Sequence, residues 1–422
     1  MLNEKNKSII GWAMYDWANS VFVTVVIAGF FPIIFKTYWA ADLNNNESTF
    51  WLGVANAIAS LAVVCIAPLL GAIGDKFYLR KELLLGSMLV GAVTTAALSS
   101  LSQGDWVLVV ILYIIASIGF MVANVFYDAL LIPVSAHGQI DKVSGLGYGL
   151  GYLGGGLSLA ACVYLSQQPE IMGYSESINV VLMCFILVAL WWFIFSLPLA
   201  VWTKDSTAPS ESRKSISVFR QTYNVFKSVF SNSQIRLFLI AYWVYIDGVD
   251  TIIRMAVDYG MALGFESEDL IVALLITQFV GFPAAIIYGY IGSHVGVKQS
   301  LLAGIGVYML ITWLGYTMSS IADFYILAVL IGLVQGGVQA MSRSFFARMV
   351  PKNKAAEYFG IYNMLGKSAA IIGPLLMGGV ALLTGNHRYS ILSLIVLFVV
   401  GAFLLSQVKN VKCATESSEC RE

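Results

Sequence analysis

The chain carries the sequence GAIGDKFYLRK at residues 71–81, and the stretch GYIGSHVGVK at 289–298 follows a similar pattern. Three landmarks in or near the first stretch recur at one offset of 218 residues: Gly71 and Gly289, Gly74 and Gly292, Pro133 and Pro351. Chance matches seldom share one offset. We therefore expect the second half of the chain to repeat the first.

Both stretches lie in strongly apolar sequence. Of the 422 residues, 59% are hydrophobic and only 11% are charged, against about 25% charged in an ordinary soluble domain. An all-α polytopic membrane protein is therefore expected. A span needs about 20 apolar residues. On that rule we predict twelve spans, at 11–39, 50–73, 82–101, 106–131, 144–166, 178–202, 235–258, 268–291, 299–319, 323–347, 356–384 and 388–408.

A polar, Ser-rich segment divides these spans six and six. The expected units are an N-terminal six-helix bundle (1–203), a cytoplasmic linker (204–234), a C-terminal six-helix bundle (235–408) and a cytoplasmic tail (409–422). Within the linker, FRQTYNVFKSVF at 219–230 either lies on the membrane surface as a short helix or extends the seventh span. Two six-helix halves in parallel repeat are typical of secondary transporters.

Lys and Arg gather on one side of the predicted spans. With the N-terminus in the cytoplasm, 20 of the 24 fall in inner segments, and only Arg388 falls in an outer loop. By the positive-inside rule both termini should be cytoplasmic. The chain is compact, so we expect a multi-pass protein of a bacterial inner (plasma) membrane.

Several functions are not supported by any motif. The run GLGYGLGYLGGG at 145–156 lacks the Gly-Lys-Ser/Thr ending of a phosphate-binding loop. Three scattered histidines and no close cysteine pair give no metal site. We expect no cofactor, no enzymatic activity and no nucleic-acid partner. We expect a monomer whose partners are a small-molecule substrate, the lipid bilayer and protons.

The seventh span, YWVYIDGVDTIIRMAVD at 242–258, carries four charges on one helical face. Asp250, Arg254 and Asp258 follow Asp247 at offsets of three, seven and eleven residues. A charge at the bilayer centre costs at least about 2.5–3.5 kcal/mol, so this face meets protein or a water-filled cavity. One interpretation is a substrate or ion pathway. The other is internal neutralisation, with Arg254 bridging both later aspartates.

A second charged residue, Lys367, is expected at the same depth in the bilayer as Asp247. Asp247 lies about 12 residues into its span, roughly 18 Å, near the middle of the bilayer. Lys367, Gln335 and Gln278 lie at similar depths in spans eleven, ten and eight. Lys367 needs a partner, and Asp247 is the expected one. The pair either works in coupled transport or is a static buried ion pair. The glutamines either touch substrate or only join helices.

The stretch at 71–81 resembles the loop between spans two and three of the major facilitator superfamily, whose pattern is roughly G-x-x-x-D-(R/K)-x-G-R-(R/K). Five residues match it: Gly71, Asp75, Lys76, Arg80 and Lys81. Tyr78 departs from the usual glycine. YDWANSVF at 15–22 and the stretch from 335 to 374 resemble the branch named after the yeast autophagy-related vacuolar amino-acid effluxer.

This resemblance implies a cytoplasmic gate. Asp75, Arg80 and Lys81 would form a latch between the halves, with Asp75 accepting hydrogen bonds from the N-terminus of span eleven. A solvated loop is the alternative. Asp128, close in height, is expected to pair with Arg80.

A weaker second latch is expected from Arg343, Arg348 and Glu357. Asp16 and Asn19, at i,i+3 in span one, belong to the branch motif and are expected in the cavity. The alternative for Asp16 is a helix cap.

Together these features predict a secondary active transporter that moves a small polar solute by alternating access with proton coupling through Asp247. By resemblance, the solute is an amino acid. An exporter of a lipid or drug-like amphiphile, and a non-transporting receptor on the same scaffold, are the alternatives. The residues expected along the pathway are Asp247, Lys367, Asp250, Arg254, Gln335, Asp16, Asn19 and Gln278.

Overall fold

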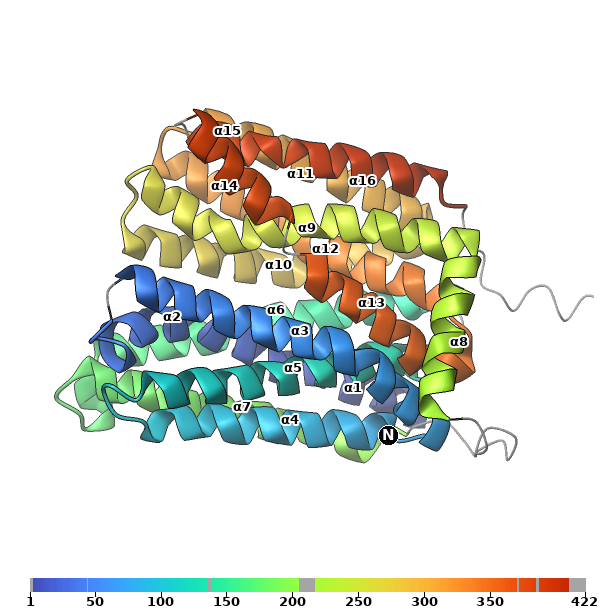
Figure 1. Cartoon of the computed structure of the whole chain (residues 1–422), viewed down its shortest axis with the longest axis horizontal. Coiled ribbons are helices and arrows are strands. Elements are labelled where there is room, and N and C mark those ends of the chain that lie inside the picture. Colours follow the sequence, from blue (N-terminus) through green and yellow to red (C-terminus); the bar gives the residue numbers. More distant parts are fainter. Residues whose placement is uncertain are drawn as a thin grey trace, which may run out of the picture.

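The computed structural model describes residues 3–43, 45–135, 138–204, 217–369, 372–384 and 387–409, and every regular element within them is a helix (Figure 1). The first half comprises α1 (Glu4–Val21), η1 (Phe22–Phe30), α2 (Phe31–Ile34), η2 (Phe35–Trp39), α3 (Asn45–Phe77), α4 (Arg80–Ala97), η3 (Leu98–Ser100), α5 (Trp106–Val134), α6 (Ile140–Gln167), η4 (Pro169–Met172) and α7 (Ser177–Trp202). The second comprises α8 (Val218–Ser231), α9 (Ser233–Ala262), α10 (Ser267–Val295), α11 (Val297–Thr317), α12 (Ile321–Met349), η6 (Lys352–Lys354), α13 (Ala355–Ala369), α14 (Ile372–Thr384), α15 (His387–Ser393) and α16 (Ile395–Gln407).

The predicted all-α fold of two six-helix bundles is confirmed. Figure 1 shows α1–α7 below and most of α9–α16 above, with α13 at the level of α3 and the long helices running side by side. In the described ranges, ten helices are long and apolar enough to cross a membrane. The other two expected spans are α9, which carries the charged stripe, and span eleven. The expected span at 356–384 is described in two parts, α13 and α14, on either side of residues 370–371.

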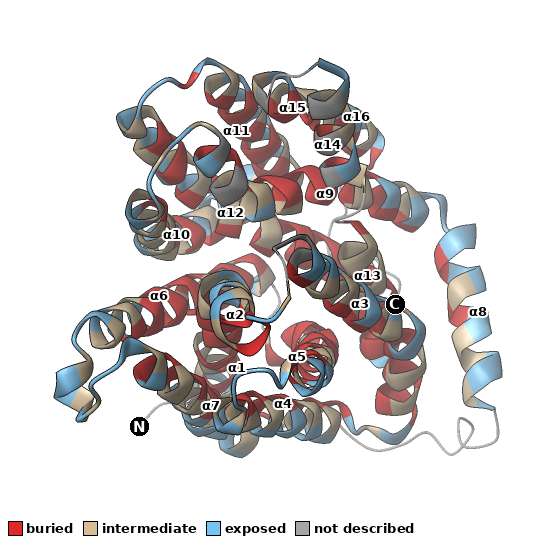
Figure 2. Cartoon of the chain, turned by 60° about the vertical axis from the view of Figure 1, so that its left-hand side comes forward, coloured by how far each residue is buried: buried red, intermediate tan, exposed pale blue. Residues whose placement is uncertain are grey.

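Burial explains why these apolar helices assemble. Buried residues gather on the faces that helices turn to their neighbours, as Figure 2 shows. Large apolar side chains also cover the outside; Leu61 is 65% exposed and Val201 is 72% exposed. An outer surface of this kind suits lipid, in which a helix satisfies all of its own backbone hydrogen bonds.

The two halves approach closely along α6 with α10 and along α3 with α13. A Cβ atom on Gly145 of α6 would lie 2.7 Å from the Ala285 carbonyl oxygen and 3.0 Å from Gly289 Cα. A Cβ on Gly360 of α13 would lie 2.9 Å from the carbonyl oxygen of Ala67. Small residues thus let helices of opposite halves touch through their backbones.

The bundle has two chemically different ends. We call the end where α3 finishes and α4 begins the basic end, because its segments carry Lys76, Arg80, Lys142, Arg348 and Lys352. We call the opposite end the acidic end, after Asp42, Asp105, Glu170 and Glu266.

Helix α8 crosses the basic end (Figure 1) and buries Val225 and Val229. It is separate from α9. The side chain of Asn232 accepts hydrogen bonds from the Gln234 and Ile235 amides at 3.0 and 3.2 Å, and so begins α9 afresh. The segment 219–230 therefore does not extend span seven.

Candidate functional site

Asp75 joins the two halves at the basic end. Its buried carboxylate, at the end of α3, accepts hydrogen bonds from the Ala356 and Glu357 amides at 3.1 and 2.8 Å. These amides open α13, where a helix N-terminus favours negative charge. Arg80 Nε donates to the same carboxylate at 2.6 Å. The hydrogen bonds that the resemblance implied for Asp75 are therefore formed, and they come from span eleven.

Lys81 does not take part in this contact between halves. Its Nζ donates to the carbonyl oxygen of Ala200 at 3.3 Å, near the end of α7 in the same half. Its place in the expected latch is thus corrected. Lys81 is the second residue of α4, and its side chain reaches the neighbouring helix α7 of the same half rather than crossing the interface.

Arg343 makes the most extensive contact between the halves. It stands on α12 in the second half and is 2% exposed. Its guanidinium carbon lies 4.9, 5.2 and 4.4 Å from the ring centroids of Trp12, Tyr127 and Tyr148, all in the first half. Its nitrogens donate to the hydroxyl and carbonyl oxygens of Ser144, each at 3.0 Å.

Two carboxylates complete the surroundings of Arg343. Asp128 Oδ1 lies 3.2 Å and Asp16 Oδ2 lies 4.0 Å from Arg343 Nη1. The other oxygen of Asp128 accepts from the Asn363 amide at 2.9 Å. The expected pair of Asp128 with Arg80 is therefore wrong. Asp128 faces α12 and α13 across the interface, whereas Arg80 is bound to Asp75.

The two remaining residues of the expected second latch, Arg348 and Glu357, contact different helices. Arg348 Nη2 pairs with the buried Asp141 of α6, again across the halves. Glu357 accepts a hydrogen bond from the Gln221 side chain of α8, so it ties the amphipathic helix to the start of α13.

Asp16 lies well inside α1, so the cap interpretation is wrong. Asn3 caps this helix instead. Tyr127 donates its hydroxyl to Asp16 at 3.0 Å. Asn19, one turn further, donates to the side-chain oxygen of Asn124 on α5 at 2.8 Å.

Asp247 is not paired with Lys367. The carboxylate of Asp247 is 1% exposed, and both of its oxygens accept from the Gly373 amide, at 3.1 and 3.0 Å. Gly373 lies at the start of α14, so Asp247 caps the second part of span eleven. Lys367 stands on α13, so the two charges do not meet.

Lys367 has other neighbours. It interacts electrostatically with Asp250, Arg254 and Asp128. Asp250 and Lys367 are partly exposed, and Arg254 is exposed. Among the described side chains, none of Asp250, Arg254 and Lys367 has an opposite charge within 4.0 Å. The side chain of Asp258 lies outside the described residues, so its expected bridge to Arg254 stays a prediction.

The glutamines connect helices. Gln278 donates to the Thr24 hydroxyl at 3.1 Å, from α10 to η1. Gln335 of α12 interacts with the side chain of Tyr152 on α6. Both contacts join the halves.

The polar contacts between halves lie unevenly along the bundle. In the described part of the chain they run from Asp75 and Arg348 at the basic end to Gln278 and Thr24 near the middle. The two halves are thus fastened at the basic end.

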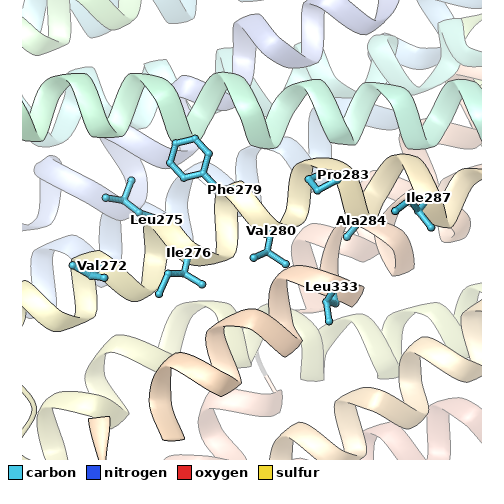
Figure 3. A pocket seen from close by; sticks show the side chains of 9 residues that line it. All are labelled: Val272, Leu275, Ile276, Phe279, Val280, Pro283, Ala284, Ile287 and Leu333. Atoms are coloured by element: carbon cyan, nitrogen blue, oxygen red, sulfur yellow. The ribbon is translucent and has the colours of Figure 1, made fainter. Parts of the chain in front are cut away.

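A groove of about 550 Å³ lies along α10 and α12, and its lining has no charged or polar side chain. Figure 3 shows its nine side chains, all of them apolar: Val272, Leu275, Ile276, Phe279, Val280, Pro283, Ala284, Ile287 and Leu333. A polar solute would find no group to orient it there. The groove is therefore not the candidate site.

Several partners at the basic end were not predicted from the sequence. Asp141, Ser144 and Asn363 were not singled out. Asn363 lies in the 335–374 stretch, and a polar side chain within an apolar span was the available signal. Nothing local marked Trp12 or Tyr127, because aromatic residues are common inside apolar helices.

Comparison with known proteins places these features in a family. The family model described as "Vacuole effluxer Atg22 like" matches residues 44–138 and 134–418. The MFS-type transporter YxiO of Bacillus subtilis (strain 168) is 38% identical over 412 residues, covering 97% of this chain and 96% of that protein. Autophagy-related protein 22 of Eremothecium gossypii is 24% identical over 477 residues, covering 96% and 91%.

Solved structures share the fold. The major facilitator superfamily transporter FucP, in the outward conformation, superposes with a TM-score of 0.71 at 12% identity. The match covers 96% of this chain and all of that chain.

Proposed function

The chain belongs to the Atg22-like family of major facilitator transporters, and from that premise we propose that it carries a zwitterionic solute, an amino acid, with proton coupling. The observation that carries this proposal is the group of charges formed by Asp250, Arg254 and Lys367. They lie toward the acidic side of the contacts that fasten the halves.

The charges of this group suit an amino acid. Asp250 can bind an ammonium group, and Arg254 or Lys367 can bind a carboxylate. Their partial exposure keeps them accessible, and no described opposite charge within 4.0 Å competes for them. A solute bound here would meet both signs at once, which supports a zwitterion over an apolar amphiphile.

We further propose that the basic end faces the cytoplasm, in agreement with the positive-inside rule. The structure then corresponds to a transporter closed on the cytoplasmic side. Release of Asp75, Arg343 and Arg348 from their partners would open that side, as alternating access requires.

Asp247 is the proposed coupling residue. A buried carboxylate in a span, without a described counter-ion, is a natural proton acceptor. A proton on Asp247 would weaken its hold on the Gly373 amide, because a neutral acid is the poorer acceptor. Protonation would thereby change how α14 is anchored relative to α13.

The substrate proposal is tested by counterflow in proteoliposomes with a panel of radiolabelled amino acids. Wild-type protein should exchange at least one of them. Asp250→Asn should lower that exchange by about tenfold or more, since a hydrogen bond to a charged group contributes roughly 1.5–3 kcal/mol. Tyr164→Phe, at an exposed position on α6, is the control. If folded protein exchanges no amino acid, the substrate class is wrong.

The coupling proposal is tested by measuring uphill uptake and exchange separately. Asp247→Asn keeps an oxygen that can accept from Gly373 but cannot take up a proton at neutral pH. We expect it to abolish accumulation driven by a proton gradient while exchange persists. An Asp247→Asn protein that still accumulates solute with wild-type dependence on the gradient would remove Asp247 from the coupling step.

A further inference from the structure

We propose that the surroundings of Arg343 form a binding site for an organic cation, a guanidinium or ammonium group, which Arg343 itself fills in this conformation. We call this site the Arg343 socket; it consists of Trp12, Asp16, Tyr127, Asp128, Ser144 and Tyr148. The inference rests on the proposed alternating access, because the socket becomes available only when the halves part.

The socket belongs wholly to the first half. Trp12 and Asp16 come from α1, Tyr127 and Asp128 from α5, and Ser144 and Tyr148 from α6. Its occupant comes from α12 in the second half. When the basic end opens, Arg343 leaves with α12 and the socket stays behind as one piece.

The chemistry of the socket is specific for cations. The rings of Trp12 and Tyr127 are stacked, with centroids 4.3 Å apart and planes 10° apart. Tyr148 adds a third ring, and the guanidinium carbon of Arg343 lies within 5.2 Å of each ring centroid. Aromatic faces attract cations most strongly where water is excluded. Arg343 is almost fully buried there.

The two carboxylates leave the socket negatively charged once Arg343 has moved out. Asp16 and Asp128 both face one guanidinium, at 4.0 and 3.2 Å. Removing one partner of a buried ion pair leaves an uncompensated charge, which is strongly unfavourable. A solute with a guanidinium or ammonium group can replace Arg343, compete with closure of the basic end, and be released when Arg343 returns. Arg343 would thus act as the competitor that expels the bound cation.

The proposal is tested with substitutions that remove the Arg343 side chain from the socket and do not require the halves to separate. Arg343→Ala and the less disruptive Arg343→Gln remove the internal cation, and ethylguanidinium is the probe because it reproduces the end of an arginine side chain. Ethylurea, its neutral isostere, is the matched ligand control. Arg348→Ala removes another arginine that bridges the halves at the basic end but leaves the socket filled. The readout is the unfolding temperature of the purified protein in detergent over a probe titration.

Ethylguanidinium should raise the unfolding temperature of Arg343→Ala or Arg343→Gln saturably, by about 2–4 °C. Ethylurea should not, and wild type and Arg348→Ala should not respond. Adding Asp128→Asn should abolish the response. A folded Arg343→Gln protein with no saturable response, or an equal response in Arg348→Ala, would overturn the proposal. Because binding is measured without transport, this outcome is independent of the counterflow result.

Discussion

Tyr78 occupies a backbone position that favours glycine. Its φ is +57°, and no other non-glycine residue in the described ranges has a positive φ. In the superfamily pattern that this loop resembles, a glycine stands here. The left-handed conformation costs an L-residue roughly 1–2 kcal/mol, which explains the usual glycine. The turn between α3 and α4 thus holds strain beside Asp75 and Arg80.

We therefore expect Tyr78→Gly to be more stable than Tyr78→Ala by about 1 kcal/mol, although both lose the ring. At Leu79, where φ is −106°, we expect the reverse: Leu79→Ala should be more stable than Leu79→Gly. Unfolding temperatures of the four variants in detergent measure the difference. Equal stability of the two Tyr78 variants would mean that the turn relaxes.

At the scale of the helices, the contact between Asp247 and α14 could not be predicted from the sequence. The apolar run at 356–384 is long enough for one span, and Pro374 is its local signal for interrupted helical hydrogen bonding. That signal does not say which side chain meets the neighbouring Gly373 amide, and the partner is Asp247 in another helix. A sequence pattern could locate Asp247 and Lys367 at one depth, but only the fold shows that Asp247 contacts α14 and that Lys367 stands on α13.

The latch was more predictable than the socket. Asp75 and Arg80 lie in one short motif, so resemblance sufficed to expect their contact with span eleven. The Arg343 socket draws its residues from three helices and its occupant from a fourth. Such a site arises from packing alone, and its aromatic members look like ordinary core residues in the sequence.

Close contact between α3 and α13 leads to a prediction about Gly71. A Cβ atom there would overlap the carbonyl oxygen of Ala356 in the opposite half, whereas Gly86 on α4 has nothing within 4 Å. Overpacking costs roughly 1–3 kcal/mol, and each 1.4 kcal/mol corresponds to a factor of ten. Gly71→Val should therefore lower counterflow by about tenfold or more, and Gly86→Val should leave it within about twofold. Similar rates in both variants would contradict a tight contact at Gly71.

At the scale of the molecule, three contacts join the halves at the basic end. They are the hydrogen bonds from the start of α13 to Asp75, the filled Arg343 socket and the Arg348–Asp141 pair. The polar contacts between halves given above extend from this end to Gln278 and Thr24 near the middle of the bundle. The charges proposed to bind solute lie toward the acidic side of these contacts. A closed basic end is what one state of an alternating-access transporter requires.

The most direct measurement is the distance between spin labels at both ends of the α6–α10 interface. Gln139 and Ser293 mark the basic end, and Gln168 and Glu266 mark the acidic end. Labelling uses a background in which the native cysteines are serine. Gly71→Val, which wedges the basic end, is compared with Gly86→Val. We expect Gly71→Val to lengthen the basic-end distance and to shorten the acidic-end distance, and Gly86→Val to change neither. If both ends move together, or neither moves in folded Gly71→Val protein, the two-state rocking of the halves is contradicted.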